Sequence, residues 1–489
     1  VMTSFNTVNG IPATGNKKLM RGILRDEMGF DGVLISDWAA IEETIYHGYC
    51  ADKEDAAIRA VEAGVDIDMM TGIYCDNLCR LVREGKIPES LVDECCMRIL
   101  ELKNKLGLFE NPYKDADEEK EQQLILCKEH RELAREAARK SFVLLKNEEQ
   151  ILPLDKTKKT AFIGPYVNSR NLMGSWSIIG EAKDITTVEE IMAVEEAGNN
   201  VVCCQGSPML GAEVILEGFT KENQATYTPE EEAKMLEEAL EAAKKTDQVV
   251  LFIGEDRLQS GEATSNATIQ IPQIQQNLLE RVAEINENIA VVLFSGRPLD
   301  LRDVQVKAKA ILEVWMPGTE GAGAITDVLY GRYNPTGKLP MSFPYCVGQV
   351  PVHYNEYATG RPHVEGKDKD RFRSKYLDIP NAPLYPFGYG LSYTTFTVSE
   401  VSMDKDNMKD GESIRAAVTV KNTGTCAGTE TIQLYLHDVA ASVVRPVKEL
   451  KDFRKVTLQP EEEARGLALS SELFINGSLN TFAQPTNVN

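Results

Sequence analysis

Short apolar runs alternate with helical patterns over the first 70 residues of the chain. Val33, Leu34 and Ile35 form an uninterrupted apolar run, which is typical of a strand buried on both faces. Residues 1–6 (VMTSFN) and 63–69 (AGVDIDM) are two further strand-like runs, and the helical DKEDAAIRAVEAG precedes the second of them. This alternation predicts a parallel sheet with crossover helices. A long helical stretch, broken at Pro88, follows it.

A second α/β system is predicted between residues 158 and 345. The sequence KEHRELAREAARKSFVLLKN, residues 128–147, is predicted to be a helix that leads into it. Strong helical patterns separate several of the apolar runs that follow, so we expect an open, mostly parallel sheet covered by helices on both faces. The runs are TAFIGPY (160–166), NVVCCQG (200–206), QVVLFIGED (248–256), NIAVVLFSG (288–296) and AILEVWMPG (310–318).

The pattern changes again in the last third of the chain. Residues 346–388 are rich in Pro, Tyr, Gly and charge and predict a long irregular arm, whereas strict alternation from Thr394 onward predicts an all-β sandwich. After LQPEEEARG the alternation fades, and we expect the sandwich to be incomplete there. The polar, acidic segment 112–123 separates the first region from the second. The expected domains are residues 1–112, 113–345 and 346–489.

Composition narrows the choice of partners and compartment. The net charge of −22, from 53 basic and 75 acidic residues, argues against a nucleic-acid partner, whose phosphates require Lys and Arg. No apolar run approaches the roughly 20 residues that a membrane span requires. The ten cysteines lack the spacing of a zinc site, so we expect no metal. Unpaired thiols favour the cytoplasm over the periplasm.

A carboxylate stands directly after the first apolar run, in Ser36-Asp37-Trp38. A buried strand has no packing reason to end on an acid beside a large aromatic. Two explanations are open from the residues alone. Asp37 could cap a helix or form an Asx turn, or it could be a catalytic group at the carboxyl end of a barrel strand.

The first region is short for a barrel. A (β/α)8 barrel takes ~250 residues, so the ~110 residues available here would supply about three βα units. If Asp37 lies at the end of a barrel strand, we expect the chain to begin inside that domain. The fold class is then the C-terminal part of a (β/α)8 barrel, an open α/β sandwich and an all-β sandwich.

An ordered series of motifs resembles glycoside hydrolase family 3, and most closely its bacterial β-glucosidases with a trailing fibronectin-type-III-like domain. The resemblance covers nearly the whole chain to about residue 460 and implies that Asp37 is the catalytic nucleophile. The motifs are VMTSFNTVNGIP, LRDEMGFDGVLISDW, AGVDIDMM, LGLFENPY, HRELAREAARKSFVLLKNEEQILPL, NLMGSWS, SGEATS, VWMPGTEGAGAITDVLYGRYNPTGKLPMSFP and LYPFGYGLSYTTF.

The chemistry of such enzymes requires a second carboxyl group, about 5–5.5 Å from the nucleophile, to protonate the leaving oxygen. The resemblance places this acid/base on the glutamate of Ser260-Gly261-Glu262, in a loop after the strand QVVLFIGE. Glu255, nearer the strand end, is the alternative. The loop departs from its relatives at Asn266, where they usually carry Arg, so its anchoring is expected to differ.

Five residues form the expected sugar-binding set. Trp38 beside the nucleophile is expected to form a platform for the apolar face of a sugar. Met2 and Phe5 occupy a comparable strand end, with Phe5 where many relatives carry Tyr, and Met69 follows the third strand. Ser207 completes the set in the second domain.

Two further segments keep more than one interpretation. Asp66 and Asp68 could line the sugar subsite or serve the barrel structurally, and the sequence favours neither. The segment that begins at Gly318 follows a strand and opens a helix, as a nucleotide-binding turn does, but its order is not GxGxxG and no GK[ST] follows. We therefore expect no cofactor.

The resemblance implies an exo-acting retaining glycoside hydrolase that releases terminal β-D-glucose from β-glucosides and cello-oligosaccharides. The alternatives are a non-catalytic remnant that binds sugar and a β-xylosidase or another specificity of the family. Because the earlier barrel strands would supply part of the sugar subsite, residues 1–489 alone are expected to be inactive. The expected partners are the sugar substrate and a second copy in a homodimer, in the cytoplasm or the periplasm.

Overall fold

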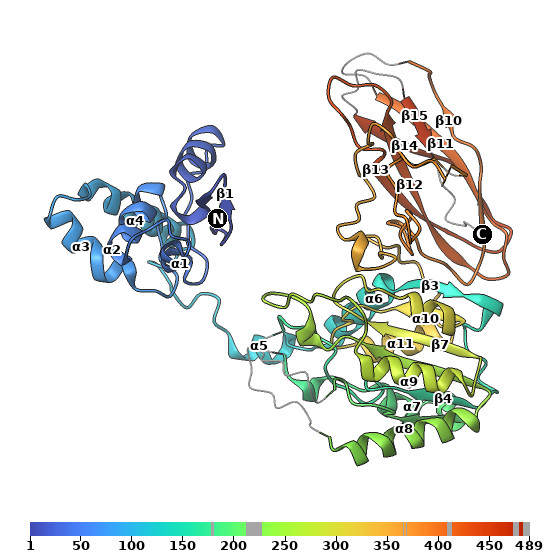
Figure 1. Cartoon of the computed structure of the whole chain (residues 1–489). Coiled ribbons are helices and arrows are strands. Elements are labelled where there is room, and N and C mark those ends of the chain that lie inside the picture. Colours follow the sequence, from blue (N-terminus) through green and yellow to red (C-terminus); the bar gives the residue numbers. More distant parts are fainter. Residues whose placement is uncertain are drawn as a thin grey trace. The chain divides into compact units, whose positions relative to one another are not determined.

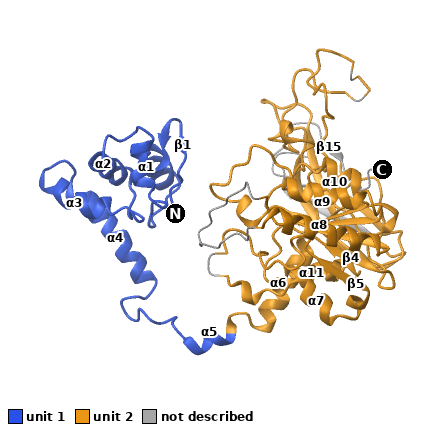
Figure 2. Cartoon of the chain, turned by 60° about the horizontal axis from the view of Figure 1, so that its bottom comes forward, with its two compact units in different colours: residues 1–123 blue, residues 124–489 orange. Residues whose placement is uncertain are grey.

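The computed structural model describes residues 1–177, 180–211, 227–364, 366–367, 369–407, 413–472 and 479–482. The chain divides into two compact units, Val1–Gln123 and Leu124–Asn489 (Figure 2). Among the described residues, no helix combines the length and the apolar character needed to cross a membrane.

Three parallel chain segments organise unit 1. Bridges join Met2 to Ile35 and Ile35 to Ile67, both in parallel, so the three predicted strand-like runs lie side by side. The predicted break at Pro88 is confirmed, since one helix ends at Arg83 and the next begins at Glu89. The elements of this part of the chain are β1 (Thr7–Val8), β2 (Ile11–Pro12), η1 (Ala13–Gly15), the π-type helix η2 (Lys18–Glu27), α1 (Ala40–Tyr46), α2 (Lys53–Ala63), α3 (Ile73–Arg83), α4 (Glu89–Lys105) and α5 (Glu118–Leu124).

Local signals set the bounds of α2, which packs on the middle segment. Its first turn is capped by Asp52, whose side chain accepts a hydrogen bond from the Asp55 amide, and it ends at Gly64 in the left-handed region at φ +93°. Its inner face contributes Val61 to a core that also holds Leu34. The strand-like run that contains Leu34 therefore packs on a helix whose start and end are set by its own local sequence.

Asp66 ties the second and third segments together from inside unit 1. Its side chain is fully buried and pairs with Arg25 at 2.9 Å and with Arg98 at 2.8 Å. The same carboxylate accepts a hydrogen bond from the Leu34 amide at 2.8 Å. All the contacts of this side chain are therefore within the framework that holds the Asp37 strand, and of the two interpretations of Asp66 the structure supports the structural one.

We predict that Asp66→Ala destabilises unit 1 by about 3–5 kcal/mol, because the substitution leaves the buried Arg25 without its carboxylate partner and the Leu34 amide without an acceptor. Urea unfolding in a Trp176→Phe/Trp315→Phe background measures this, since Trp38 is then the only tryptophan and lies in unit 1. The control Asp93→Ala removes an exposed carboxylate of α4. Equal midpoints for the two variants would contradict the structural role.

A six-stranded sheet forms the core of unit 2 (Figure 1), and it confirms the predicted open, mostly parallel sheet. Its strands follow the order β3-β8-β7-β6-β4-β5, and all neighbours pair in parallel except β3 with β8. The strands are β3 (Val143–Asn147), β4 (Thr160–Ile163), β5 (Val201–Cys204), β6 (Gln248–Gly254), β7 (Ile289–Phe294) and β8 (Ala310–Glu313).

The helix predicted over residues 128–147 is wrong in its last third. Helix α6 (Lys128–Ser141) ends at Ser141, and Val143–Asn147 forms strand β3, antiparallel to β8. Val143, Leu144 and Leu145 are buried. The tertiary contacts of Val143–Leu145, which are buried beside β8, therefore decide the structure of this segment, although a helical pattern precedes it.

The two faces of the sheet are covered by different helices (Figure 1). Alternate residues of β6 divide between two cores: Val250 and Phe252 pack with α6, α7 and α11, while Leu251 and Ile253 pack with α8, α9 and α10. These elements are α7 (Val188–Val194), α8 (Pro229–Lys244), α9 (Gln273–Ala283), α10 (Arg302–Lys307) and α11 (Gly321–Leu329), with the short helices η3 (Glu148–Gln150), η4 (Ala182–Asp184), η5 (Glu196–Asn200), η6 (Arg257–Gln259) and η7 (Val347–Gln349).

The predicted β-sandwich is confirmed in the last part of the chain. One sheet joins β9, β10, β11 and β14, and the other joins β12, β13 and β15, all by antiparallel pairing. Strands β14 and β15 lie where the alternating pattern fades in the sequence. The bounds are β9 (Phe396–Val398), β10 (Ser402–Met403), β11 (Ser413–Asn422), β12 (Gly428–Asp438), β13 (Glu449–Leu458), β14 (Glu463–Glu472) and β15 (Leu479–Phe482).

Candidate active site

Asp37 stands where the middle segment of unit 1 ends. The Ser36 amide donates to the Ile67 carbonyl at 2.9 Å, and the Ser36 hydroxyl accepts from the Met69 amide at 2.8 Å, so two strand ends are bonded together beside it. The half-buried Asp37 side chain accepts a hydrogen bond from the Trp38 amide at 2.6 Å. Among the described residues, no other group donates to this carboxylate.

The turn after Asp37 separates the helix-cap explanation from the catalytic one. The residue before α1 is Ala39, in the left-handed region at φ 58°, and no side chain caps this helix. The Asp37 side chain therefore caps no amide of α1. A left-handed non-glycine residue is uncommon, and such residues cluster at functional sites. Met70, after the third segment, shares this conformation at φ 79°.

The expected sugar-binding residues of unit 1 gather at the same strand ends. The parallel bridges place Met2, Ile35 and Ile67 at one level, so Phe5, Asp37 and Met69 all follow that level within three residues. Trp38 is 58% exposed and Met2 is 52% exposed, although both are apolar. Phe5 and Met69 are half-buried. Unit 1 thus presents apolar and aromatic surface beside the Asp37 carboxylate.

Asp68 belongs to the turn that follows the third segment. Its carboxylate accepts from the Thr71 hydroxyl at 2.6 Å and from the Tyr74 amide at 3.2 Å. These bonds hold the start of α3, and the side chain is half-buried. The contacts support a structural role for Asp68 at the rim of the strand ends.

In unit 2 the second candidate carboxylate lies at a topological switch point. The chain passes from β4 to β5 on one side and returns to β6 on the other, and ligands of open α/β sheets bind outside the carboxyl ends of the strands at such a point. Residues 255–266, named the β6 loop here, leave the sheet at this place. A Cβ at Gly254 would lie 1.9 Å from the Phe294 carbonyl oxygen, so only glycine allows β6 to end so close to β7.

The two glutamates of the β6 loop have opposite environments. Glu255 is 1% exposed, and one of its carboxylate oxygens lies 3.2 Å from Arg297 Nε. Glu262 is exposed, and its carboxylate has no hydrogen bond or ion pair with another described residue. Of the two, Glu262 has the access to solvent that a group acting on a bound molecule requires.

Hydrogen bonds within the β6 loop shape the turn around Glu262. The Thr264 hydroxyl donates to the Gly261 carbonyl at 2.7 Å, and Asn266 Nδ2 donates to the Gln259 carbonyl at 3.2 Å. Asn266, the position expected to alter the anchoring, is therefore itself an anchor of the loop. Gly261 adopts φ +112°, which L side chains rarely adopt, and permits the sharp turn before Glu262.

Three family models match this chain. The glycosyl hydrolase family 3 C-terminal domain matches residues 142–393, just over half of the chain, and the N-terminal domain of the same family matches residues 1–102. A fibronectin type III-like domain matches residues 430–466. The chain belongs to glycosyl hydrolase family 3. Asp37 falls in the N-terminal family domain and Glu262 in the C-terminal one.

Relatives in family 3 extend over almost the whole chain. A periplasmic beta-glucosidase of Salmonella typhimurium is 42% identical over 94% of this chain, and a beta-xylosidase of Formosa agariphila is 35% identical over 94%. The crystal structure of a beta-glucosidase from Listeria innocua in complex with isofagomine is 43% identical over 96% of this chain, with a TM-score of 0.87. Further structures of that protein contain glucose and, in a mutant, laminaribiose. The chain spans 61% of the Salmonella protein, 62% of the Formosa protein and 62% of the Listeria structure.

Burial shifts the protonation of two glutamates behind the β6 loop of this family 3 chain. It raises the pKa of Glu255 from 4.5 to about 6, against the opposing ion pair with Arg297. Burial also raises the pKa of the fully buried Glu313, although that carboxyl accepts from the Trp315 amide and the Ser295 hydroxyl. Both groups therefore bind protons more readily in the folded chain than in the unfolded one.

We predict a pH-dependent stability difference between the wild type and Glu255→Gln. Because the folded pKa lies above the unfolded one, the folded chain binds more protons between these values and loses stability as pH rises. The rise of the Glu255 pKa from 4.5 to about 6 implies a loss of about 2 kcal/mol for the wild type relative to Glu255→Gln between pH 4.5 and 7. Urea unfolding at several pH values measures it, with the exposed Glu287→Gln as control. A difference that stays constant with pH would contradict the shift.

Ser207 and the segment that begins at Gly318 both pack closely against other residues of unit 2. Ser207 follows β5 at the carboxyl edge, is 3% exposed, and donates its hydroxyl to the Pro208 carbonyl at 3.0 Å. The hydroxyl proton is thus engaged, and a contact with a sugar would use the lone pairs of the Ser207 oxygen as acceptors. In the segment that opens α11, Gly323 packs against the Arg135 guanidinium, since a Cβ there would lie 2.9 Å from it. That side chain occupies the space over the helix.

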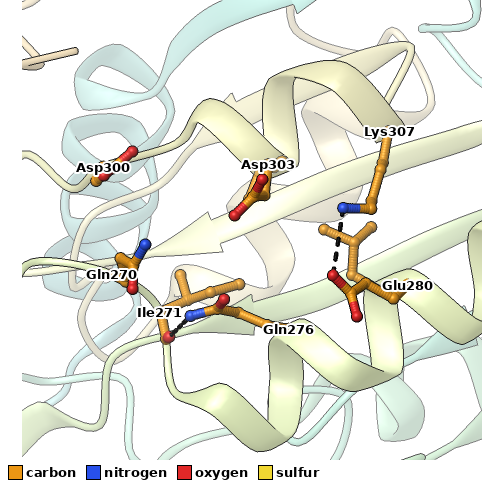
Figure 3. Close-up of a pocket in the computed structure, with 9 residues that line it drawn as sticks. Gln270, Ile271, Gln276, Glu280, Asp300, Asp303 and Lys307 are labelled. Atoms are coloured by element: carbon orange, nitrogen blue, oxygen red, sulfur yellow. Dashed lines mark hydrogen bonds and ion pairs between the residues drawn. The ribbon is translucent and has the colours of Figure 1, made fainter. Parts of the chain in front are cut away.

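A pocket between α9 and α10 lies apart from the candidate residues (Figure 3). Within it, Lys307 Nζ lies 3.5 Å from Glu280, and Gln276 donates to the Ile271 carbonyl at 2.6 Å. None of the candidate site residues lines it. Across the described ranges, no three His, Cys, Asp or Glu side chains gather as a metal site would require. The pocket is lined by Gln270, Ile271, Gln276, Leu279, Glu280, Asp300, Asp303, Val304 and Lys307.

Proposed function

We propose that the protein containing this chain is an exo-acting retaining β-glucosidase. The observation that carries the proposal is the likeness to the Listeria beta-glucosidase, at 43% identity and a TM-score of 0.87 over 96% of this chain. Identity at this level, extending through both catalytic family domains, supports a shared reaction. The substrate class is β-glucosides and cello-oligosaccharides, with laminaribiose added because a mutant of the Listeria protein binds it.

In the proposed mechanism Asp37 attacks the anomeric carbon and forms a covalent glycosyl-enzyme, while Glu262 protonates the departing glycosidic oxygen. Glu262 then removes a proton from the water that releases the sugar. The contacts of Asp37 support its role as nucleophile. The carboxylate stands at a strand end that is hydrogen-bonded to its neighbour, and among the described residues only the Trp38 amide donates to it. The burial of Glu255 supports Glu262 over that alternative.

Sugar binding is assigned to side chains at the two sets of strand ends. Trp38 offers its exposed ring as a platform for the apolar face of a pyranose. Met2, Phe5 and Met69 supply the apolar surface around it, and Ser207 is the proposed contact in unit 2. The proposal includes no metal and no cofactor, because displacement by two carboxyl groups requires neither.

A β-xylosidase is the second candidate, favoured by the Formosa relative at 35% identity. Glucose and xylose differ by one hydroxymethyl group, and an aromatic platform binds both. For the compartment, the likeness to the periplasmic beta-glucosidase of Salmonella supports the periplasm over the cytoplasm. A homodimer is proposed as the assembly, with sedimentation velocity as its measurement.

The test uses the longest natural polypeptide that contains residues 1–489, assayed on a panel of nitrophenyl glycosides. The proposal expects the β-glucoside to have the highest kcat/KM and proton NMR to show β-glucose as the first product. A higher kcat/KM on the β-xyloside would favour the second candidate. Sugar binding by calorimetry without turnover of any glycoside would instead favour a non-catalytic sugar-binding protein.

A further inference from the structure

One guanidinium contacts the β6 loop on both sides of Glu262. Arg297 follows β7, the neighbour of β6, and its Nη2 donates to the Gln259 carbonyl and to the Thr264 carbonyl, the latter at 3.1 Å. These carbonyls flank the Gly261-Glu262 turn. Because the Glu262 carboxylate has no hydrogen bond or ion pair with the other described residues, the backbone of this turn sets its position.

A buried acid fixes Arg297 in turn. Glu255 lies 3.2 Å from Arg297 Nε, and the Glu255 amide donates to the Phe294 carbonyl at 2.9 Å. The Glu255 carbonyl accepts from the buried Tyr166 hydroxyl. The anchor of the guanidinium is therefore the first residue of the loop, which is itself hydrogen-bonded to the end of β7 and to Tyr166. A rigidly held anchor restricts the movement of Arg297 and of the carbonyls that it contacts.

Close packing adds a second constraint at the same point. A Cβ at Gly296 would lie 1.8 Å from the Ser260 hydroxyl oxygen, so the β6 loop rests directly on the backbone that precedes Arg297. Ser260 itself is buried. The loop is thus held at Ser260 by contact with Gly296, and at Gln259 and Thr264 by hydrogen bonds from Arg297.

We infer that Arg297 is a positioning residue, which holds the β6 loop so that the Glu262 carboxyl meets the leaving oxygen. This inference rests on the proposed role of Glu262. The guanidinium suits the task because it donates to two carbonyls through Nη2 while its Nε side forms an ion pair with Glu255, whereas an ammonium is a single point of charge.

The experiment compares Arg297→Ala and Arg297→Lys with the wild type on two substrates, in the longest natural polypeptide that contains the chain. Arg297→Ala is expected to lower kcat/KM about 100-fold on methyl β-glucoside, because displacement of a catalytic group by about 1 Å costs this much. On 2,4-dinitrophenyl β-glucoside, whose leaving group requires no proton, the loss is expected to stay within about threefold. Arg297→Lys keeps a charge beside Glu255, so the fold is preserved, and about a tenfold loss on the methyl glucoside is expected.

A double-mutant cycle separates this inference from the proposed function. In a Glu262→Ala background, Arg297→Ala is expected to cost less than about threefold more on the methyl glucoside, because its effect passes through Glu262. If Glu262→Ala itself loses no more on the methyl glucoside than on the dinitrophenyl glucoside, the proposed acid/base fails. If Glu262→Ala shows the difference but neither Arg297 variant does, the positioning role alone fails.

Hydrogen exchange on the 489-residue chain gives a readout that is independent of activity. At fixed pH, Arg297→Lys is expected to accelerate exchange in peptides that cover residues 256–266 and to leave those of β6 and β7 unchanged. The matched control is Arg302→Lys, at the start of α10, whose guanidinium pairs with Asp300 at 2.7 Å and has no hydrogen bond or ion pair with the described residues 255–266. Equal exchange in the wild type and Arg297→Lys would overturn the inference.

Discussion

Asp37→Ala is expected to lower kcat by about 10⁴-fold or more on every glucoside, because it removes the covalent step on which the retaining mechanism depends. The fold should survive, since the only hydrogen bond to the carboxylate from a described residue comes from the neighbouring Trp38 amide. The measurement is kcat on nitrophenyl β-glucoside in the longest natural polypeptide that contains the chain, with circular dichroism to confirm the fold. The matched control is Asp31→Ala, which removes an exposed carboxylate from the other end of the same segment and is expected to leave kcat unchanged.

Covalent labelling identifies the nucleophile directly. A 2-deoxy-2-fluoroglucoside with an activated leaving group forms a glycosyl-enzyme that breaks down slowly, so mass spectrometry of peptides should locate the sugar on Asp37. The Asp31→Ala variant should be labelled like the wild type, and Asp37→Ala should not be labelled. A sugar found on another carboxylate would show that the SDW aspartate is not the nucleophile.

The sheet of unit 2 could be predicted from the sequence because each parallel strand is an apolar run flanked by a helical pattern. β6 and β7 are buried along their whole lengths, and burial on both faces favours the nearly continuous apolar runs of their sequences. Strand β3 could not be predicted in this way. Its run, Phe142 to Leu145, is too short for periodicity to distinguish a strand from a buried helix, and its partner β8 lies far away in the sequence.

The nucleophile candidate was accessible to sequence reasoning because a carboxylate after a buried strand lacks a packing explanation. Arg297 carries the same signal, since its charged side chain stands at the third position after Phe294, the last residue of β7, but the sequence does not show which backbone carbonyls it contacts. The choice between Glu255 and Glu262 required burial. Both are glutamates of one loop, and only the packing of the β6 end against β7 places Glu255 inside and leaves Glu262 exposed.

Asp66 shows a different limit. As one of two acids at the end of the third segment, Asp66 could from the sequence be either a sugar ligand or a structural group. Its partners Arg25 and Arg98 come from η2 and α4, which lie about 30–40 residues away on either side. No pattern of single positions predicts that two arginines from separate helices converge on one buried carboxylate, because the convergence is a product of the tertiary fold.

The acid/base assignment predicts a loss that depends on the leaving group. Glu262→Ala is expected to lower kcat/KM on methyl β-glucoside by about 10²–10⁴-fold, the usual contribution of a general acid, and to lower it far less on 2,4-dinitrophenyl β-glucoside. The reason is that an alkoxide leaves only with a proton, whereas dinitrophenolate leaves without one. The measurement is kcat/KM on both substrates in the longest natural polypeptide that contains the chain.

Azide then distinguishes Glu262 from its neighbour Glu255. In Glu262→Ala, where the carboxylate is gone, azide should reach the glycosyl-enzyme and restore turnover of the dinitrophenyl glucoside as β-glucosyl azide. Glu255→Gln leaves the Glu262 carboxylate in place and changes only the buried side chain that pairs with Arg297. This variant should therefore show a weaker dependence on the leaving group and no rescue by azide. Rescue of Glu255→Gln without rescue of Glu262→Ala would reverse the assignment, and it would require the β6 loop to expose in the working enzyme a side chain that the structure buries to 1%.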